Sequence, residues 1–189
     1  MKGYQSDEKM EGRDFTTTGF AKGEYERCVF KNCNFASVNL SDVFFLECEF
    51  ENCDLSMATL TNTALRSVHF RNCKMLGLRF DQCNKLLLSM GFDNCLLDFS
   101  SFHKLKMKST DFKGSRLHEV EFMEADLTQS KFAGCDLLRA NFENTILTGV
   151  DFRSAINYSI DPERNMMKGA RFSLTEIHGL LEKYNIHIE

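Results

Sequence analysis

Apolar residues recur at every fifth position along most of this chain. Between residues 112 and 152 these positions, which we term centres, are occupied only by phenylalanine or leucine: Phe112, Leu117, Phe122, Leu127, Phe132, Leu137, Phe142, Leu147 and Phe152. The residue two places before each centre is small, as Ala125 and Ser130 illustrate. Because this period fits neither an α-helix nor a continuous strand, the chain must turn a corner about every five residues.

Short extended segments joined by such corners predict a four-sided coil of about twenty residues. Successive coils would stack through backbone hydrogen bonds, so residues about twenty positions apart would lie above one another in columns. The centres run regularly over residues 15–80. The frame then resumes at Leu87, which indicates that two residues are inserted around Asn84, Lys85 and Leu86.

The insertion is interpreted as a bulge at a corner, which leaves the solenoid continuous. With two residues allowed for the bulge, one column collects seven phenylalanines in register: Phe30, Phe50, Phe70, Phe92, Phe112, Phe132 and Phe152. Phe172, twenty positions further on, extends the same column. We therefore predict an all-β solenoid over residues 15–172, with stacked aromatic rings supplying much of its core.

The two ends of the chain depart from the five-residue period. Residues 1–14 show no period and are interpreted as an N-terminal arm. Beyond residue 172, Ser173 and Glu176 match a capping box that opens a short C-terminal α-helix through about Lys183. We expect residues 173–189 to cover the open end of the last coil or to form a dimer interface. The expected interface residues are Leu174, Ile177, Leu180, Leu181, Tyr184, Ile186 and Ile188, the last two in a tail that alternates like a strand.

Composition and charge narrow the possible functions. The 189 residues include one proline, no tryptophan and 43% hydrophobic residues, enough to fill one continuous core. No apolar run is long enough to span a bilayer, and residues 1–13 lack the features of a signal peptide, so we expect a cytoplasmic protein. Residues 27–157 carry 15 Lys and Arg against 16 Asp and Glu, a net charge of −1. This near-neutral body is atypical of proteins that bind nucleic acid directly.

The eight cysteines invite a metal or disulfide interpretation, but they occupy the small position two places before a centre. Cys33, Cys53, Cys73 and Cys95 share one predicted face, at a separation that a disulfide could span. In a reducing compartment we expect free thiols in the core. The sequence contains no zinc motif, catalytic triad, phosphate-binding loop or carboxylate pair by spacing. We therefore expect no catalytic residue, no metal and no cofactor.

One predicted surface, beside the bulge, departs from the charged and polar exterior of the other columns. Its outward positions are mainly apolar, and an apolar surface of this kind marks a contact site. The candidate partner-binding residues are Phe44, Leu46, Ala64, Asn84, Lys85, Leu86 and Leu88. Two alternatives stay open. The N-terminal arm, with Tyr4 and Met10, folds over this surface, or the phase of the repeat at the bulge is misassigned.

The repeat loosely matches the pattern Ala-(Asp or Asn)-Leu-X-X, and over residues 15–172 the chain resembles the pentapeptide-repeat family. Within that family, residues 53–58 (CDLSMA), followed by Asn72 and Cys73, are similar to the Qnr and MfpA-like quinolone-resistance proteins. The ending over residues 171–188 is also similar to the carboxyl terminus of Qnr proteins.

The resemblance implies a right-handed quadrilateral β-helix that forms a homodimer through its C-terminal helix. It also implies binding to DNA gyrase or topoisomerase IV and protection of that enzyme from quinolones by DNA mimicry. No outward carboxylate stripe is visible, because one outward column mixes signs: Glu49, His69, Gly91, Asp111, Lys131 and Asp151. We expect a non-enzymatic binding protein with a type II topoisomerase as the leading partner. An interaction scaffold for another cytosolic protein is the alternative.

Overall fold

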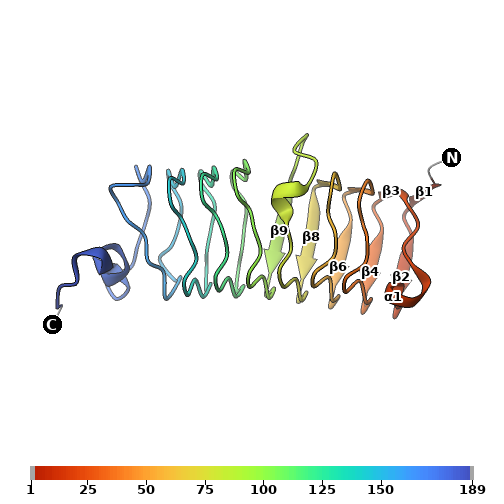
Figure 1. The fold of residues 1–189 in the computed structure, drawn as a ribbon, viewed down its shortest axis with the longest axis horizontal. Coiled ribbons are helices and arrows are strands. Elements are labelled where there is room, and N and C mark those ends of the chain that lie inside the picture. The colour runs from red at the N-terminus through yellow and green to blue at the C-terminus, as the bar shows by residue number, and fades with distance from the viewer. Residues whose placement is uncertain (1–2, 188–189) are drawn as a thin grey trace.

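The computed structural model describes residues 3–187 as a parallel β-solenoid, in which the chain winds around one long axis (Figure 1). One sheet contains, in order, β1 (Gly3–Ser6), β3 (Gly23–Glu26), β5 (Phe44–Leu46) and β7 (Ala64–Arg66). A second sheet contains β2 (Lys9–Glu11), β4 (Val29–Lys31), β6 (Glu49–Glu51), β8 (Val68–Arg71) and β9 (Met90–Asp93). The first and last parts of the described chain lie at opposite ends of this rod (Figure 1).

Neighbouring strands pair residues that are twenty positions apart, except β8 and β9, where the spacing is 22. Phe30 on β4 pairs with Phe50 on β6, and the pairing is parallel throughout both sheets. Beyond β9 the same spacing continues as single bridges, such as that between Arg116 and Asp136. The predicted all-β solenoid with twenty-residue coils is confirmed.

Residues with positive φ recur at the corners and explain the five-residue period. In one corner column, Asn32, Asn52 and Asn72 have φ values of 53, 53 and 52°. The next two coils place Asn94 and Gly114 there, with φ values of 55 and 62°. Asparagine and glycine enter this left-handed region at a lower cost than most residues. At most corners one such residue turns the chain after a short extended segment.

The core is built around the predicted column of phenylalanine rings. Consecutive rings in this column are stacked, with centroids between 4.7 and 5.6 Å apart. The column contains Phe30, Phe50, Phe70, Phe92, Phe112, Phe132, Phe152 and Phe172. Because the stacking passes through Phe70 and Phe92 without a break, the bulge leaves the core continuous, as predicted.

The small position two places before each centre supplies buried hydrogen-bond donors. The Cys135 thiol donates to the carbonyl oxygen of Phe112 at 2.9 Å, and the Ser130 hydroxyl donates to that of Met107 at 2.9 Å. Each donor thus binds a carbonyl group on the preceding coil and helps to satisfy the hydrogen-bonding capacity of the buried backbone. All eight cysteines are buried, free thiols, and burial raises the pKa of Cys135 to about 12. The prediction of free core thiols is confirmed.

The insertion forms a projecting loop, which corrects one part of the predicted frame. The Asn84 amide donates to Thr63 and the Ser89 amide donates to Leu65, both at 2.9 Å, and the residues between leave the coil. Figure 1 shows this loop projecting from the rod beside the 3-10 helix η1 (Phe80–Gln82). Val68 now pairs with a residue 22 positions later, which agrees with a net insertion of two.

Leu87 was expected to be a core centre, and this expectation is wrong. Its side chain is 69% exposed, and Leu88 packs against the core in its place. The physical reason lies in the turn, where the Asn84 side chain accepts a hydrogen bond from the Leu86 amide. Leu87 then adopts a φ of 57°, which directs the chain outward before Leu88 returns to the core.

The expected N-terminal arm is also corrected, because residues 3–14 belong to the solenoid. Strand β1 pairs with β3 and strand β2 pairs with β4, in the same twenty-residue register as the later coils. Met10 occupies the position below Phe30 and packs against the core. The helix α1 (Phe15–Thr18) follows, capped by the Asp14 side chain. The period was hidden because Gln5, a polar residue, stands where an apolar centre is usual.

The C-terminal segment is helical where predicted, but it forms two 3-10 helices instead of one α-helix. These are η2 (Ile177–Leu180) and η3 (Glu182–Tyr184), and neither has a side-chain cap. Gly179 lies directly against Tyr158, and its carbonyl accepts a hydrogen bond from the Ile160 amide at 2.9 Å. This contact with the last coil overrides the helical pattern. None of the helical segments within residues 3–187 has the length and apolar character needed to span a bilayer.

We predict that Phe112→Ala lowers the free energy of unfolding by about 3–5 kcal/mol, because it removes a fully buried ring stacked between two others. Urea denaturation followed by circular dichroism measures this change. Phe99→Ala is the matched control, since the Phe99 ring is 59% exposed, and it should change stability by no more than about 0.5 kcal/mol. Equal effects of the two substitutions would contradict the assignment of the core.

Candidate docking surface

The structure brings together the three predicted partner-binding residues that precede the loop. Phe44 on β5 pairs with Ala64 on β7, and Leu46 pairs with Arg66. Phe44 is half-buried and Leu46 is 37% exposed, whereas Ala64 is buried. Ala64 therefore forms part of the floor of this surface and offers little area for direct contact.

These residues line a hollow of about 200 Å³ on the first sheet. Tyr4, Glu24, Phe44 and Ala64 follow one another up one column, because each pairs with the next through the strand register. Glu26, Leu46 and Arg66 follow one another up the parallel column. The hollow has an apolar centre with carboxylates on one side and Arg66 on the other. We refer to this surface as the β5 hollow.

The sequence left open whether the N-terminal arm folds over this surface. The position of β1 answers this question, because β1 is part of the first sheet. Tyr4 lines the β5 hollow at its N-terminal side and is 60% exposed, while its hydroxyl donates to Glu26 at 2.5 Å. Met10 packs against the core and does not line the hollow. Tyr4 and Glu24 are surface residues of the hollow that are not among the predicted partner-binding residues. Glu24 stands one place before the centre Tyr25 and twenty before Phe44, so the five-residue pattern could have found it, whereas Tyr4 lies in the first coil, where the period is hidden.

The projecting loop presents the other predicted residues differently. Leu86 and Leu87 are 63% and 69% exposed, and Lys85 is also exposed. Asn84 begins the loop and holds its turn, and Leu88 is directed to the core. The loop therefore offers two adjacent leucines to a partner. Leu87 was missed as a surface residue because the repeat frame assigned it to the interior.

Charged side chains on the second sheet form a column of alternating sign. Its members on successive coils are Glu11, Lys31, Glu51, Arg71, Asp93 and Lys113. Lys31 binds Glu51 at 3.0 Å, and Lys113 lies 3.5 Å from Asp93. Alternation of this kind neutralises the surface locally, because each charge faces an opposite charge one coil away. This column cannot act as a continuous acidic stripe.

A larger hollow, of about 400 Å³, surrounds Gly91 on β9. Its lining mixes His69, Arg71, Asp111 and Lys113 with three serines. The hollow exists because Gly91 has no side chain in an outward column, and the His69 ring leans over the space. Within residues 3–187, no group of three or more His, Cys, Asp or Glu side chains is arranged to hold a metal ion.

The candidate dimer residues divide into exposed and inward-facing sets. Leu174 is 90% exposed, and Tyr184 and Ile186 are 53% and 56% exposed. Leu180 packs against the core of its own chain, and Ile177 and Leu181 are half-buried. Residues 186–187 form no strand, and Ile188 lies outside the described residues.

The family model described as "Pentapeptide repeat region" matches residues 23–86 and 85–160. The chain belongs to the pentapeptide-repeat family. No curated protein sequence matches it.

Among solved structures, the fold is similar to that of QnrB1, described as a plasmid-mediated fluoroquinolone resistance protein. One trypsin-treated variant of QnrB1 aligns with a TM-score of 0.67 and 18% identity, covering 99% of this chain and 100% of that chain. A second trypsin-treated variant gives a TM-score of 0.64 and 18% identity over 96% and 98%. Full-length QnrB1 gives 0.50 and 19% identity over 97% and 100%. At this identity, the similarity demonstrates a shared fold.

We predict that Asp151→Asn destabilises the protein at neutral pH by about 1–2 kcal/mol, with a loss that shrinks as the pH falls. Hydrogen bonds from the Arg153 guanidinium lower the pKa of Asp151 to about 2. Because the pKa is lower in the folded state, the ionised carboxylate stabilises the protein at pH values above its ordinary pKa of 3.8. This stabilisation is lost as the pH falls toward 2. Urea denaturation of wild type and variant at several pH values measures the difference in their free energies of unfolding. A difference between wild type and variant that stays constant across this range would contradict the assignment.

Proposed function

We propose that this chain is a non-enzymatic binding protein that docks on a type II topoisomerase, DNA gyrase or topoisomerase IV, and protects it from quinolones. The observation that carries the proposal is the projecting loop, with Leu86 and Leu87 exposed on a rod whose other outward columns are mostly polar. The fold shared along its length with QnrB1, a fluoroquinolone resistance protein, supports this partner. A partner of this kind implies a cytoplasmic location.

In this proposal, apolar side chains of the loop and the β5 hollow make most of the contact, and DNA mimicry contributes less. Mimicry of a duplex needs regularly spaced negative charges. The alternating column on the second sheet and the ion pairs between coils, such as Lys74 with Asp54 at 3.2 Å, neutralise much of the surface. Apolar side chains on a rigid rod supply binding energy without such a stripe.

The second candidate is an interaction scaffold for another cytosolic protein. The β5 hollow favours it, because an apolar floor with charges at both ends suits a protein segment of any origin. The two candidates make the same use of the surface and differ only in the partner.

We predict that the wild-type protein at micromolar concentration raises the quinolone concentration needed for DNA cleavage by gyrase. Leu86→Ser with Leu87→Asn should weaken this protection by about tenfold, since two exposed leucines lose their contacts. Asparagine suits the positive φ at position 87, so the loop should keep its shape.

Leu138→Ser is the matched control for the loop variant, because Leu138 is an exposed leucine elsewhere on the rod, 44% accessible. It should protect as well as the wild type. The absence of any effect of the wild type on gyrase or topoisomerase IV would remove the topoisomerase proposal. Equal protection by wild type and the loop variant would remove the loop from the contact.

We also predict a homodimer that depends on the exposed C-terminal residues. Leu174→Ser with Ile186→Ser should convert the dimer to a monomer in sedimentation equilibrium, because both side chains are exposed in the single chain. Met166→Ser, at a 63% exposed methionine before this segment, serves as the control and should leave the dimer intact. A dimer that persists in the double variant would place the interface elsewhere.

A further inference from the structure

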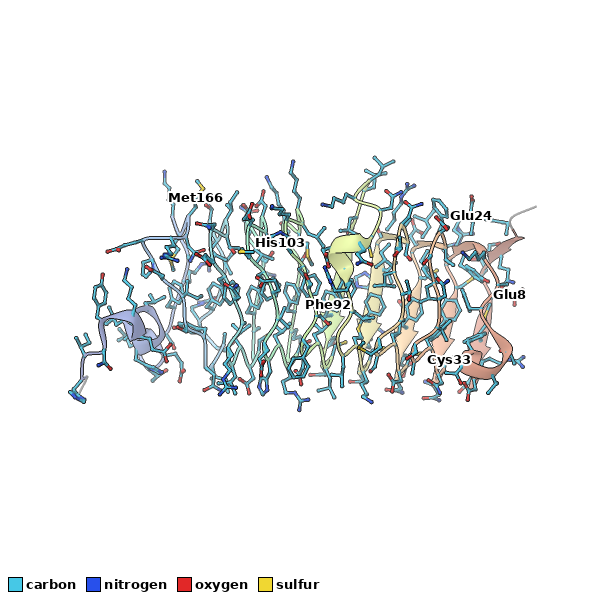
Figure 2. The ribbon with its side chains drawn as sticks, viewed as in Figure 1. Glu8, Glu24, Cys33, Phe92, His103 and Met166 are labelled. Atoms are coloured by element: carbon cyan, nitrogen blue, oxygen red, sulfur yellow. The ribbon has the colours of Figure 1, made fainter. Side chains whose placement is uncertain are left out.

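The N-terminal end of the rod presents an open strand edge. Strands β1 and β2 stand first in their sheets, and within residues 3–187 no strand or bridge pairs with their outer edges. Figure 2 shows Glu8, the residue before β2, at this end of the rod. Met10, Phe15 and Phe20 are only partly buried there, although they pack against the core. An open edge beside incompletely covered apolar side chains favours the addition of a further strand.

The backbone of β2 directs two of its residues to the open edge. Val29 pairs with Lys9 of the first coil, and the Val29 amide donates to a carbonyl of that coil at 2.9 Å. Lys31 pairs with Glu11, and its carbonyl accepts a hydrogen bond from an amide of the first coil at 2.9 Å. Residues at these two positions therefore direct their backbone groups toward the N-terminal end of the rod. On β2 these groups belong to Lys9 and Glu11, and no coil of the described chain lies there to receive them.

The charges of β2 suit an antiparallel copy of the same strand. With a two-fold axis at Met10, Lys9 of each copy lies opposite Glu11 of the other, and Met10 lies opposite its own counterpart. Lys9 and Glu11 then form the hydrogen-bonded pairs of the ladder, which agrees with the direction of their backbone groups. Opposite charges directly across an antiparallel pair stabilise it. Each residue also keeps the ion pair within its own chain, Lys9 with Glu11 at 2.9 Å.

Neighbouring registers are less favourable, because they bring like charges together. An axis at Lys9 sets two lysines opposite each other, and an axis at Glu11 sets two glutamates opposite each other and Lys9 opposite Arg13. An axis between two residues would place side chains that belong to opposite faces of the sheet against each other. The axis at Met10 brings no like charges of β2 together.

We propose that the N-terminal coil is a docking surface for a second copy of this chain, joined head to head through antiparallel β2 strands. The same axis sets β1 of each copy opposite the side of the coil that carries α1, because these sides flank β2 at equal distances along the chain. The two Met10 side chains meet near the axis and extend the core from one rod toward the next. This contact is independent of docking on a topoisomerase, and it lies at the opposite end of the rod from the C-terminal dimer residues (Figure 1).

The test measures self-association by sedimentation equilibrium in the full chain carrying Leu174→Ser and Ile186→Ser, so that the proposed C-terminal contact does not contribute. This protein should form a reversible dimer at tens of micromolar, because the end of one coil is a small interface. Glu11→Lys should raise the dissociation constant of the dimer by about tenfold, since both symmetry-related contacts then bring two lysines together. Lys9→Glu added to Glu11→Lys exchanges the charges and should restore the dissociation constant to within about twofold.

Glu47→Lys is the matched control, because it makes the same charge change at an exposed corner residue two coils away from β2. It should leave the dissociation constant unchanged.

A cross-link gives a second readout of the register. The axis sets residue 10 opposite its counterpart in a non-hydrogen-bonded pair, with about 4.5 Å between Cα atoms, which a disulfide can span. Met10→Cys with oxidised glutathione should therefore give a covalent dimer on a non-reducing gel, while the native cysteines remain buried. Thr17→Cys, at an exposed residue of α1 at the same end of the rod, should stay monomeric on this gel.

A chain that stays monomeric at every concentration, with its circular dichroism unchanged, would overturn the inference. Equal dissociation constants for the Glu11→Lys and Glu47→Lys variants would also overturn it. Failure of the charge exchange to restore association, together with no Met10→Cys cross-link, would overturn the register. The readouts do not involve gyrase, so a dimer that depends on Glu11 upholds this contact whatever the topoisomerase assay gives.

Discussion

Backbone pairing between residues twenty positions apart is the interaction on which the rest of this structure depends. Each side of a coil contributes only a short strand or a single bridge, but every coil repeats it in register. The ladder therefore holds each side chain in a column with its counterparts one coil away. Inside the rod this produces a continuous stack of phenylalanine rings. Outside, it places Glu24 between Tyr4 and Phe44 and Glu51 between Lys31 and Arg71.

Separation of the core from the exterior lets the surface vary without a cost to the fold. The coil with two extra residues keeps its place in the phenylalanine stack, because Leu88 fills the position that the displaced frame vacates. The surplus chain then projects with Leu86 and Leu87 at its surface. Loops that a rigid scaffold positions are common sites of recognition. In this molecule the loop and the β5 hollow are two places where apolar side chains interrupt the polar exterior.

The two ends of the rod are completed in different ways. At the N-terminal end, β1 and β2 continue both sheets by one further coil, Phe15 stacks on Phe35, and Phe20 packs edge-on against Phe30. At the C-terminal end, Leu180 packs on the last coil, and Lys183 binds Asp161 and Glu163 at 2.6 and 2.8 Å. A solenoid needs such caps, because its last coil would otherwise expose core side chains and unpaired strand edges. Leu174 remains exposed beyond this cap.

The sequence by itself determined the period, the stacked phenylalanine column, the buried thiols and the net insertion of two residues. These features are repeated many times, and each repeat reports the same local geometry. Only the tertiary structure decided features that occur once and depend on distant contacts. Gln5 conceals the first coil until β1 is seen to pair with β3. The choice between Leu87 and Leu88 depends on the turn at Asn84, and the 3-10 geometry near Gly179 depends on its contact with Tyr158. The β5 hollow likewise required Tyr4 and Phe44, forty positions apart, to be brought to one face by the pairing of coils.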